Sequence, residues 1–528
     1  MDVESSDATR PPRRVRWWLL VAIVAASGAL LGGLQVPDLF PDDAHRNLAT
    51  LAAMGLVAGL LTLWTVLGTG LSGRQQVRTL LGVALAVAMA VGCVRVEGCS
   101  GNLTPRLTWR WKPKPDESLA TVGDEKSSAE LANVADLSST GEHDFPQFLG
   151  PNRDASVEAP AFGTDWSAHP PHLLWRQPIG AGWSSFALVG DYAVTQEQRG
   201  DDECVTCYAL DGGKLLWTHA DPGRFSHPMS GDGPRATPTV DEGRVYTLGA
   251  FGRLNCLDGR SGKLVWTHDI VKENDARPPQ WGKSCSPLVV GDLVIASAGG
   301  LKGWSLVAYN KQTGEVVWHA GDAPSSYASP RLAEMAGMRQ VLMVNADSVT
   351  GHDPDDGRVL WRFKWPGGQP KVPDAVALGG DQVFISAGYG LGCKLLEIGP
   401  SGEGGSPRVV WESNKLKPKF TNVVVRDGYV YGLDDGRTLN CLDLNDGKVR
   451  WRGGRYGHGQ ILLVNDLLLV QAELGDVALV KASPERFTEL TRFAALQGQT
   501  WNNPVVAGRL LLVRNATEAA CYELRVGD

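Results

Sequence analysis

The chain has 528 residues, of which 43% are hydrophobic and 21% charged, and its formal net charge is −7. This acidic balance gives no electrostatic attraction to a nucleic-acid backbone, so we expect no nucleic-acid partner. Nine cysteines are too few and odd in number for a disulfide framework, and the single CxxC at Cys204 and Cys207 lacks the second ligand pair of a zinc site. We predict no metal ligand and no catalytic residue from these patterns.

Residues 1–96 are predicted to form a membrane anchor. Three apolar stretches lie there, and we expect each to form a transmembrane helix: 17–36, 48–71 and 77–94. A helix needs roughly 17 to 25 apolar residues to cross a bilayer, so the first two are long enough. The third contains a charge-free run of only 16 residues, and it crosses if Arg78 and Arg95 snorkel toward the two interfaces. Its crossing stays open.

Charged residues beside these stretches predict the orientation. The N-terminal segment is basic, with Arg10, Arg13, Arg14 and Arg16, and so is the loop between the second and third stretches, with Arg74 and Arg78. The loop between the first two stretches is acidic, because it holds Asp38, Asp42 and Asp43 and a single basic residue, Arg46. The positive-inside rule then gives a cytoplasmic N-terminus and an extracytoplasmic, periplasmic domain after the third stretch, in the inner membrane. Cys93 ends a sequence, "AVGC", that resembles a lipoprotein cleavage box; we interpret it as a helix-end residue and leave its lipidation open.

Residues 97–143 are polar and mixed in charge, with prolines at 105, 113 and 115. This composition is typical of a flexible linker, with a root-mean-square reach of roughly 35 to 40 Å by coil scaling. We therefore predict three parts: an anchor at 1–96, a linker at 97–143 and a folded domain at 144–528.

A tryptophan recurs through the folded domain at nearly constant spacing. It stands at Trp175, Trp217, Trp266, Trp318, Trp361, Trp411 and Trp451. A period of roughly 40 to 50 residues, with short strand-like runs between glycine-rich turns, is typical of β-propeller blades with four antiparallel strands. We expect each of these tryptophans on the outermost strand of its blade with its ring buried between neighbouring blades, so we assign the set a structural role.

The first strands of the blades can be counted. They are predicted to begin near Ser184, Ala236, Cys285, Ala328, Pro373, Thr421, Gly459 and Asn502, which gives an all-β propeller of eight blades. Blade eight has no fourth strand of its own, so residues 172–178, with Trp175, are predicted to pair with residues 521–524 and close the ring. Blade seven lacks the repeat tryptophan, and we expect Phe487 or Phe493 to take its place.

The repeat signature "LDxxxGKxxW" resembles the pyrroloquinoline quinone (PQQ) propeller repeat. That repeat occurs in quinoprotein dehydrogenases and in the propeller lipoprotein of the BAM outer-membrane assembly complex. The lead-in "DFPQFLGPNRDASV" (144–157) is similar to segments that precede such propellers in bacterial envelope proteins. The resemblance covers residues 144–526 and implies the fold, but one fold carries many functions.

The resemblance also implies where a cofactor would lie. In the dehydrogenases PQQ lies over the central channel with a tryptophan beneath it and a Ca²⁺ held by Glu, Asn and Asp, and no such ligand set can be matched here. The connections between blades should face the same channel mouth, and five of their residues are candidates for holding a planar anion: Trp183, Arg235, Trp281, Lys283 and Trp501. A solvated rim is the alternative, and we expect no cofactor, with PQQ and calcium as the second possibility.

The expected function is that of a membrane-embedded, extracytoplasmic propeller that serves as a protein-binding or assembly scaffold in the cell envelope, with a protein partner. Rim loops and strand edges of such a propeller present a peptide-binding surface. The alternative is a membrane-bound PQQ-dependent sugar or alcohol dehydrogenase, because that class also joins transmembrane helices to an eight-bladed propeller.

Overall fold

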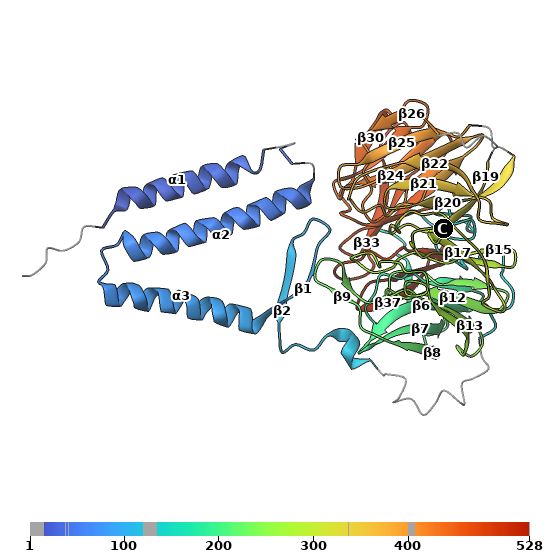
Figure 1. Cartoon of the computed structure of the whole chain (residues 1–528), viewed down its shortest axis with the longest axis horizontal. Coiled ribbons are helices and arrows are strands. Elements are labelled where there is room, and N and C mark those ends of the chain that lie inside the picture. The colour runs from blue at the N-terminus through green and yellow to red at the C-terminus, as the bar shows by residue number, and fades with distance from the viewer. Residues whose placement is uncertain are drawn as a thin grey trace, which may run out of the picture. The chain divides into compact units, whose positions relative to one another are not determined.

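The computed structural model describes residues 15–36, 39–40, 42–119, 135–335, 337–399 and 407–526. The chain divides into two compact units, Met1–Lys112 and Pro113–Asp528. Figure 1 draws the helices of the first unit in blue and the strands of the second in green to red. Each unit is described by itself.

The first unit contains three helices, one for each predicted apolar stretch: α1 (Trp17–Gly33), α2 (Asp43–Leu67) and α3 (Gly73–Cys93). By length and composition, α2 and α3 could cross a membrane, whereas α1 has only 17 residues. The prediction of three transmembrane spans is therefore supported for two. The third predicted stretch is longer than expected because its helix begins at Gly73, where Ser72 and Gln75 form a capping box.

A β-hairpin follows α3 within the same unit. Strand β1 (Val94–Cys99) pairs antiparallel with β2 (Pro105–Trp109). A single 3₁₀ turn, η1 (Pro115–Ser118), begins the second unit. Both lie in or overlap the predicted linker at 97–143, so this part of the chain has more regular structure than its composition suggested. Residues 120–134 of that linker lie outside the described residues.

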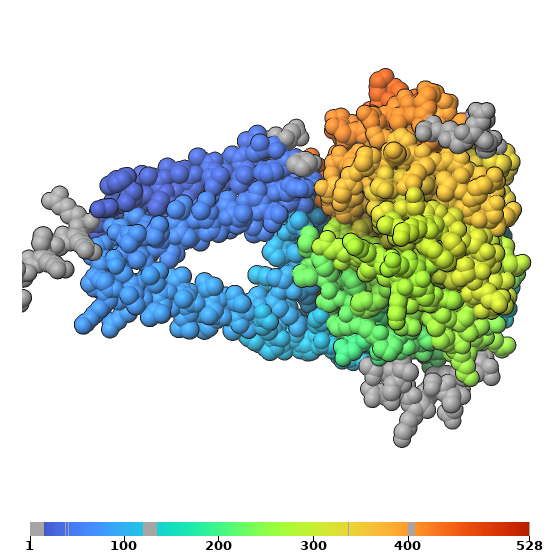
Figure 2. All heavy atoms as spheres, in the orientation of Figure 1, coloured from blue at the N-terminus to red at the C-terminus, as the bar shows by residue number. Residues whose placement is uncertain are grey.

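The second unit is a ring of eight blades, each with four antiparallel strands, which confirms the predicted propeller; the sheet of blade seven also carries a fifth, parallel strand. Blades one to four are β5–β8 (Ala187–Val189, Tyr192–Arg199, Asp202–Ala209, Leu215–Pro222), β11–β14 (Thr239–Asp241, Arg244–Leu248, Arg253–Asp258, Leu264–Asp269), β15–β18 (Leu288–Val290, Leu293–Ser297, Leu306–Asn310, Val316–Ala320) and β19–β22 (Arg331–Met335, Met338–Val344, Ser348–His352, Val359–Lys364). On the side shown in Figure 2 the atoms of successive blades abut in chain order, from green through yellow to orange.

Blades five to eight continue the ring. They are β23–β26 (Val376–Leu378, Gln382–Ala387, Gly392–Glu397, Arg408–Ser413), β27–β30 (Val424–Arg426, Tyr429–Asp434, Thr438–Asp443, Val449–Gly453), β31–β34 (Gln460–Val464, Leu467–Gln471, Asp476–Lys481, Glu489–Ala494) and β35–β37 (Val505–Ala507, Leu510–Arg514, Glu518–Glu523) with β4 (His172–Pro178). Strand β4 pairs antiparallel with β37, with Trp175 opposite Cys521. The predicted closure by an N-terminal strand is thus confirmed, and it supplies blade eight with its fourth, outermost strand.

The repeat tryptophans lie between blades, and six of the seven make the same kind of hydrogen bond. Trp361 donates its indole N–H to Gln340 Oε1 in its own blade, at 2.8 Å. The other six donate to a backbone carbonyl of the following blade: Trp175 to Leu210, Trp217 to Gly259, Trp266 to Lys311, Trp318 to Pro354, Trp411 to Leu444 and Trp451 to Ser483, at 2.7 to 3.1 Å. Each of these bonds ties one blade to the turn before the next blade's outer strand.

The glycine of the repeat makes room for the preceding blade's tryptophan. Gly314 has a φ of +78°, and a Cβ there would lie 2.8 Å from the Trp266 ring. Gly262 stands in the same relation to Trp217, at 2.5 Å. Only glycine fits both the left-handed backbone and the close contact with the tryptophan ring. The Gly–Trp spacing of the sequence therefore follows from the packing of one blade on the next.

Blade seven differs from the prediction. In blade two, Trp266 pairs with Cys256 just before the irregularity between the third and fourth strands. In blade seven the equivalent position belongs to Thr491, which pairs with Leu479. Neither Phe487 nor Phe493 therefore holds the register position of the missing tryptophan, but Phe493 packs edge-on against Tyr522 of blade eight with ring centroids 5.0 Å apart. Trp166, which precedes the ring in sequence, also covers this strand: its backbone N–H donates to Thr491 Oγ1 at 3.1 Å, and its ring meets that of Phe493 edge-on with centroids 5.2 Å apart.

Candidate functional site

The antiparallel blades give the propeller two distinct faces. The connections between blades and the turns between second and third strands lie on one face, which we call the mouth face. The turns between first and second strands, and between third and fourth strands, lie on the other. A segment that we call the strap, residues 144–159, runs over this second face, which we call the strap face.

The strap joins three blades across the strap face. Phe145 forms a β-bridge with Leu188 of blade one, and Pro146 O accepts a hydrogen bond from Val240 N of blade two at 2.8 Å. Farther along, β3 (Ser156–Val157) adds a parallel strand to blade seven beside Leu463 and Val464. The sequence resemblance marked this segment, but not its course over the ring.

Arg153 carries the strap into the wall of the central channel. Its side chain is buried, and the guanidinium donates to Pro287 O at 2.9 Å and to Ser286 O at 3.0 Å, at the start of blade three's first strand. Burial lowers the pKa of Arg153 to about 10, while the nearby charge of Asp374 opposes that shift. Burial likewise raises the pKa of Asp374 to about 6. The strap therefore places a charged group of its own inside the ring.

A chain of polar side chains lines the channel. Backbone N–H groups of successive first strands donate to the next blade's side chain: Ser185 to Thr237, Thr237 to Ser286, Ser286 to Ser329, Ser329 to Asp374 and Asp374 to Asn422, at 2.7 to 3.1 Å. These five bonds link six blades. The sequence held a signal that we did not use, because a polar residue follows every predicted first-strand start: Ser185, Thr237, Ser286, Ser329, Asp374, Asn422, Gln460 and Asn503.

Two of the five predicted ligand candidates meet at the mouth face. The rings of Trp183 and Trp501 lie 4.8 Å apart between centroids, and Phe420 lies 4.8 Å from Trp501 on another side. Trp183 donates to Ser230 O at 2.6 Å, and Trp501 donates to Glu473 Oε1 at 3.1 Å. The N–H groups of both indoles are thus already bound within the protein.

The third candidate, Trp281, belongs to a different aromatic group. Its ring lies 5.4 Å from that of Tyr327 and 6.2 Å from that of Tyr389. Its indole N–H is buried and has no hydrogen-bond partner among the residues that the structure describes. The structure therefore brings together Trp183 and Trp501, and places Trp281 with two tyrosines.

The two cationic candidates bind the protein's own carbonyls. Lys283 is 1% exposed, and its Nζ donates to Ser297 O, Ala298 O and Ser325 Oγ at 2.6 to 3.0 Å. Burial lowers the pKa of Lys283 to about 8. Arg235 donates to Ser230 O and Gly231 O, both at 3.1 Å, and lies over the Phe225 ring at 4.2 Å. Sequence could not show that these side chains fold back into the ring.

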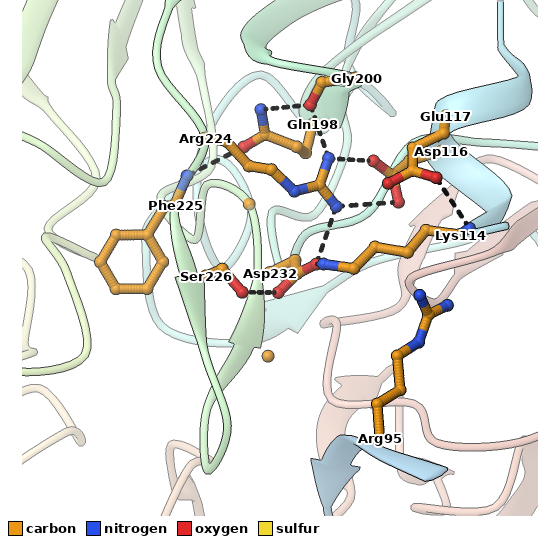
Figure 3. A network of polar contacts seen from close by, with 12 residues as sticks. Arg95, Lys114, Asp116, Glu117, Gln198, Gly200, Arg224, Phe225, Ser226 and Asp232 are labelled. Atoms are coloured by element: carbon orange, nitrogen blue, oxygen red, sulfur yellow. Dashed lines mark hydrogen bonds and ion pairs between the residues drawn. The ribbon is translucent and has the colours of Figure 1, made fainter. Parts of the chain in front are cut away.

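A polar network fixes one connection of the mouth face, residues 223–238, and we call it the latch (Figure 3). Arg224 contacts both carboxylate oxygens of Asp116 in η1, at 2.6 and 3.3 Å, and Asp232 Oδ2 at 2.9 Å. Lys114 Nζ reaches the same Asp232 oxygen at 2.6 Å. Asp116 is 2% exposed, and Arg224 is the cationic partner of this buried side chain. Residues 114–116 of the predicted linker are therefore bound to the connection that follows blade one at the mouth.

The mouth residues can be compared with the PQQ and calcium site that the resemblance implies. The aromatic half of such a site has counterparts in Trp183, Trp281 and Trp501. Within the described residues no three His, Cys, Asp or Glu side chains gather as metal ligands would. Lys283 and Arg235 are also engaged with backbone carbonyls and are not positioned as free anion-binding groups.

The mouth face also exposes large apolar side chains at its tips. Phe251, in the turn between the second and third strands of blade two, is 49% exposed, and Leu474, in the same turn of blade seven, is 76% exposed. Leu301 of blade three and Met229 of the latch connection are exposed as well. We call these four residues the mouth tips. Apolar residues raised on turns around a rim are typical of protein-binding surfaces.

Comparison with known proteins relates this propeller to two groups. Residues 201–453 match a family model described as outer membrane protein assembly factor BamB. The BamB of Burkholderia pseudomallei is 25% identical over 57% of this chain and 75% of its own length. The quinohemoprotein alcohol dehydrogenase ADH-IIG of Pseudomonas putida is 26% identical over 46% of this chain, but the match spans only 32% of the enzyme's length.

Solved structures show the same fold. The BamB of Moraxella catarrhalis superposes with a TM-score of 0.50 at 14% identity, covering 68% of this chain and 99% of that one. The quinohemoprotein alcohol dehydrogenase of Comamonas testosteroni gives 0.54 at 12% identity, covering 76% and 85%. The folded part of this chain is thus an eight-bladed β-propeller that is similar both to BamB and to the quinoprotein alcohol dehydrogenases.

Proposed function

We propose that this chain is a membrane-anchored, extracytoplasmic propeller that binds another protein through its mouth face and acts as an assembly scaffold in the cell envelope. The observation that carries the proposal is the exposure of the four mouth tips, Met229, Phe251, Leu301 and Leu474, on one face. The strap runs over the opposite face. The mouth face is therefore the end of the ring that offers apolar contact area to a partner.

The relatives support a scaffold. The match to BamB covers 75% of that protein, whose name describes an outer membrane protein assembly factor. The match to ADH-IIG covers 32% of the enzyme. At the mouth, the two predicted cationic ligands bind carbonyls of the protein itself, which favours a structural role for them.

The anchor and its orientation belong to the same proposal. Helices α2 and α3 cross the membrane with Arg74 and Arg78 on the cytoplasmic side, which puts the propeller outside the cytoplasm whether or not α1 crosses. If α1 crosses, the N-terminus is cytoplasmic. A topology reporter fused at residue 75 should be active only in the cytoplasm, and one fused at residue 110 only outside it. Both fusions active on one side would refute the two-span anchor.

Co-purification from native membranes tests the scaffold. The double variant Phe251→Ser/Leu474→Ser should lose the partner that the wild-type full chain retains, because each change removes an apolar anchor from the rim. The matched control is Val316→Ser/Val317→Ser, which removes two apolar residues, 46% and 51% exposed, from an outer strand. Equal partner recovery from all three proteins would contradict a role for the mouth tips.

A second candidate function is a membrane-bound PQQ-dependent alcohol or sugar dehydrogenase. The aromatic pair Trp183 and Trp501 favours it, since planar cofactors bind among aromatic rings, and so does the buried indole N–H of Trp281, which has no partner within the described ranges. Reconstitution of the full chain with PQQ and Ca²⁺, followed by absorbance and a dye-linked oxidation assay, tests it. Saturable cofactor binding with turnover would establish the enzyme, and the absence of both would leave the scaffold.

A further inference from the structure

The hairpin β1–β2 is amphipathic. Val94 lies opposite Trp109 and Val96 opposite Leu107, so these four side chains share one face. Arg95 lies opposite Thr108, and Arg106 and Arg110 alternate with the apolar residues of β2, so the other face is basic and polar. One short hairpin thus separates an apolar side from a cationic side.

The apolar face is uncovered and rich in tryptophan. Leu107 is 64% exposed, and Trp109 and Trp111 are 53% and 67% exposed. The two indole rings stack on each other with centroids 5.0 Å apart and an interplanar angle of 11°. Two adjacent exposed tryptophans in water leave a large apolar area unburied, which indicates a surface that is covered in the cell.

The hairpin is attached at the ends of two helices. Arg110 Nε donates to Val91 O and Val94 O, at 3.0 and 3.2 Å, at the end of α3. At the other end of the hairpin, Asn47 near the start of α2 donates its side-chain N–H to Asn102 O at 2.9 Å. Figure 1 shows the hairpin running from the end of α3 toward the start of α2, across the helix axes.

We infer that this hairpin lies in the outer interface of the membrane, with Val96, Leu107, Trp109 and Trp111 in the lipid and the basic residues at the phosphate headgroups. The inference rests on the proposed anchor: if α2 and α3 cross, their ends at Asn47 and Val91 lie at the outer surface, and the hairpin that joins these ends lies at the same depth. Tryptophan favours this depth because its ring is apolar and its N–H polar.

The charges of the hairpin fit lipid headgroups. Arg95, Arg106, Arg110 and Lys112 stand against Glu97 alone in this segment. Such an excess of basic residues just outside a membrane helix runs against the usual charge bias of membrane proteins, so it calls for a local partner. Phosphate oxygens of lipid headgroups supply that partner, since arginine binds phosphate through several N–H groups.

Environment-sensitive fluorophores on single cysteines test the depth of the hairpin. The full chain carries Cys93→Ser and Cys99→Ser, since its other seven cysteines are buried. A nitrobenzoxadiazole label is attached at Leu107→Cys on the apolar face, or at Arg106→Cys, its exposed neighbour on the basic face. A label at Leu85→Cys, an exposed position on α3, reports membrane insertion. The proteins are placed in vesicles of phosphatidylethanolamine and phosphatidylglycerol.

The label at 107 should be quenched by lipids with a doxyl group near the headgroup, and it should be protected from aqueous iodide at least about threefold relative to the label at 106. Equal iodide quenching at 106 and 107, with the Leu85 label quenched by lipid, would overturn the inference and leave the anchor intact. A Leu85 label that lipid does not quench would overturn the anchor as well.

Discussion

The tryptophans of this propeller occupy two environments, the outer strands and the mouth. On the outer strands six of the seven repeat tryptophans donate to a carbonyl of the following blade. At the mouth, the Trp183 indole donates to a carbonyl of the blade-one connection and the Trp501 indole donates to the Glu473 side chain, whereas the Trp281 indole N–H has no hydrogen-bond partner among the described residues. A residue that recurs in one environment is packing the repeat, whereas a residue that occurs once has a local role.

The largest expected effect concerns an outer tryptophan. Trp266→Ala should lower the free energy of unfolding by about 3 to 5 kcal/mol, because it opens a cavity between blades two and three and removes one hydrogen bond to the Lys311 carbonyl. Trp281→Ala, at a half-buried mouth position, should cost clearly less. Denaturant titration of the detergent-solubilised chain measures both. Equal losses would remove the distinction between the two kinds of tryptophan.

The glycine beside that tryptophan gives a smaller effect. Gly314→Ala should cost about 2 to 3 kcal/mol, since its φ is +78° and the added Cβ would lie 2.8 Å from the Trp266 ring. The control Gly291→Ala has a φ of +57° with no atom within 4 Å of its Cβ, so it should show only backbone strain, about 1 kcal/mol. If Gly314→Ala and Gly291→Ala lowered the melting temperature equally, Gly314 would be required only for the left-handed backbone of its turn and not for contact with Trp266.

A buried carboxylate makes one mouth turn sensitive to pH. Glu203 accepts the N–H of Ala250, the residue before Phe251, and burial raises the pKa of Glu203 to about 7. The folded state therefore binds an extra proton between the unfolded value near 4.5 and about 7, and the contribution of Glu203 to stability falls as pH rises through that range.

The variant Glu203→Gln stays neutral, so its stability relative to wild type should rise by up to about 2 kcal/mol from pH 5 to pH 8. Denaturant titrations of both proteins across this range measure the difference. A difference that does not change with pH would mean that Glu203 titrates at its ordinary value.

The smallest global effect is expected at the latch. Arg224→Ala leaves Asp116 buried without its bidentate partner, so residues 114–118 should detach from blade one while the ring stays folded. Hydrogen exchange at these residues should speed up at least about tenfold, with a change in melting temperature of only a few degrees. Arg358→Ala, which breaks an exposed pair with Asp353, is the control and should change neither.

The regular part of the fold could be read from the sequence because each blade repeats one packing problem. The spacing of glycine and tryptophan predicted the blades, the count of first strands predicted their number, and the surplus strand at 172–178 predicted the closure of the ring. The packing of blade seven was not predicted, because Trp166, which covers its outer strand, lies outside the repeat. A contact between segments distant in sequence produces no periodic pattern.

The candidate site was less predictable. Trp183 and Trp501 come together as neighbours at the mouth, but Lys283 turns inward to three oxygen acceptors, and the sequence carries no sign of that direction. The polar channel residues, such as Ser286 and Asp374, do repeat with the blades and could have been found. The hairpin at 94–109 was missed because its alternation is short and lies among charged residues.

The central claim is that the mouth face binds a protein. A photoreactive benzoylphenylalanine placed at Phe251, or at Glu242 on the strap face as the control, tests it in intact cells. Irradiation should give one discrete adduct from position 251 and none from position 242, and excess PQQ with Ca²⁺ added to membranes should not reduce the yield. No adduct from 251, or equal adducts from both faces, would contradict the account.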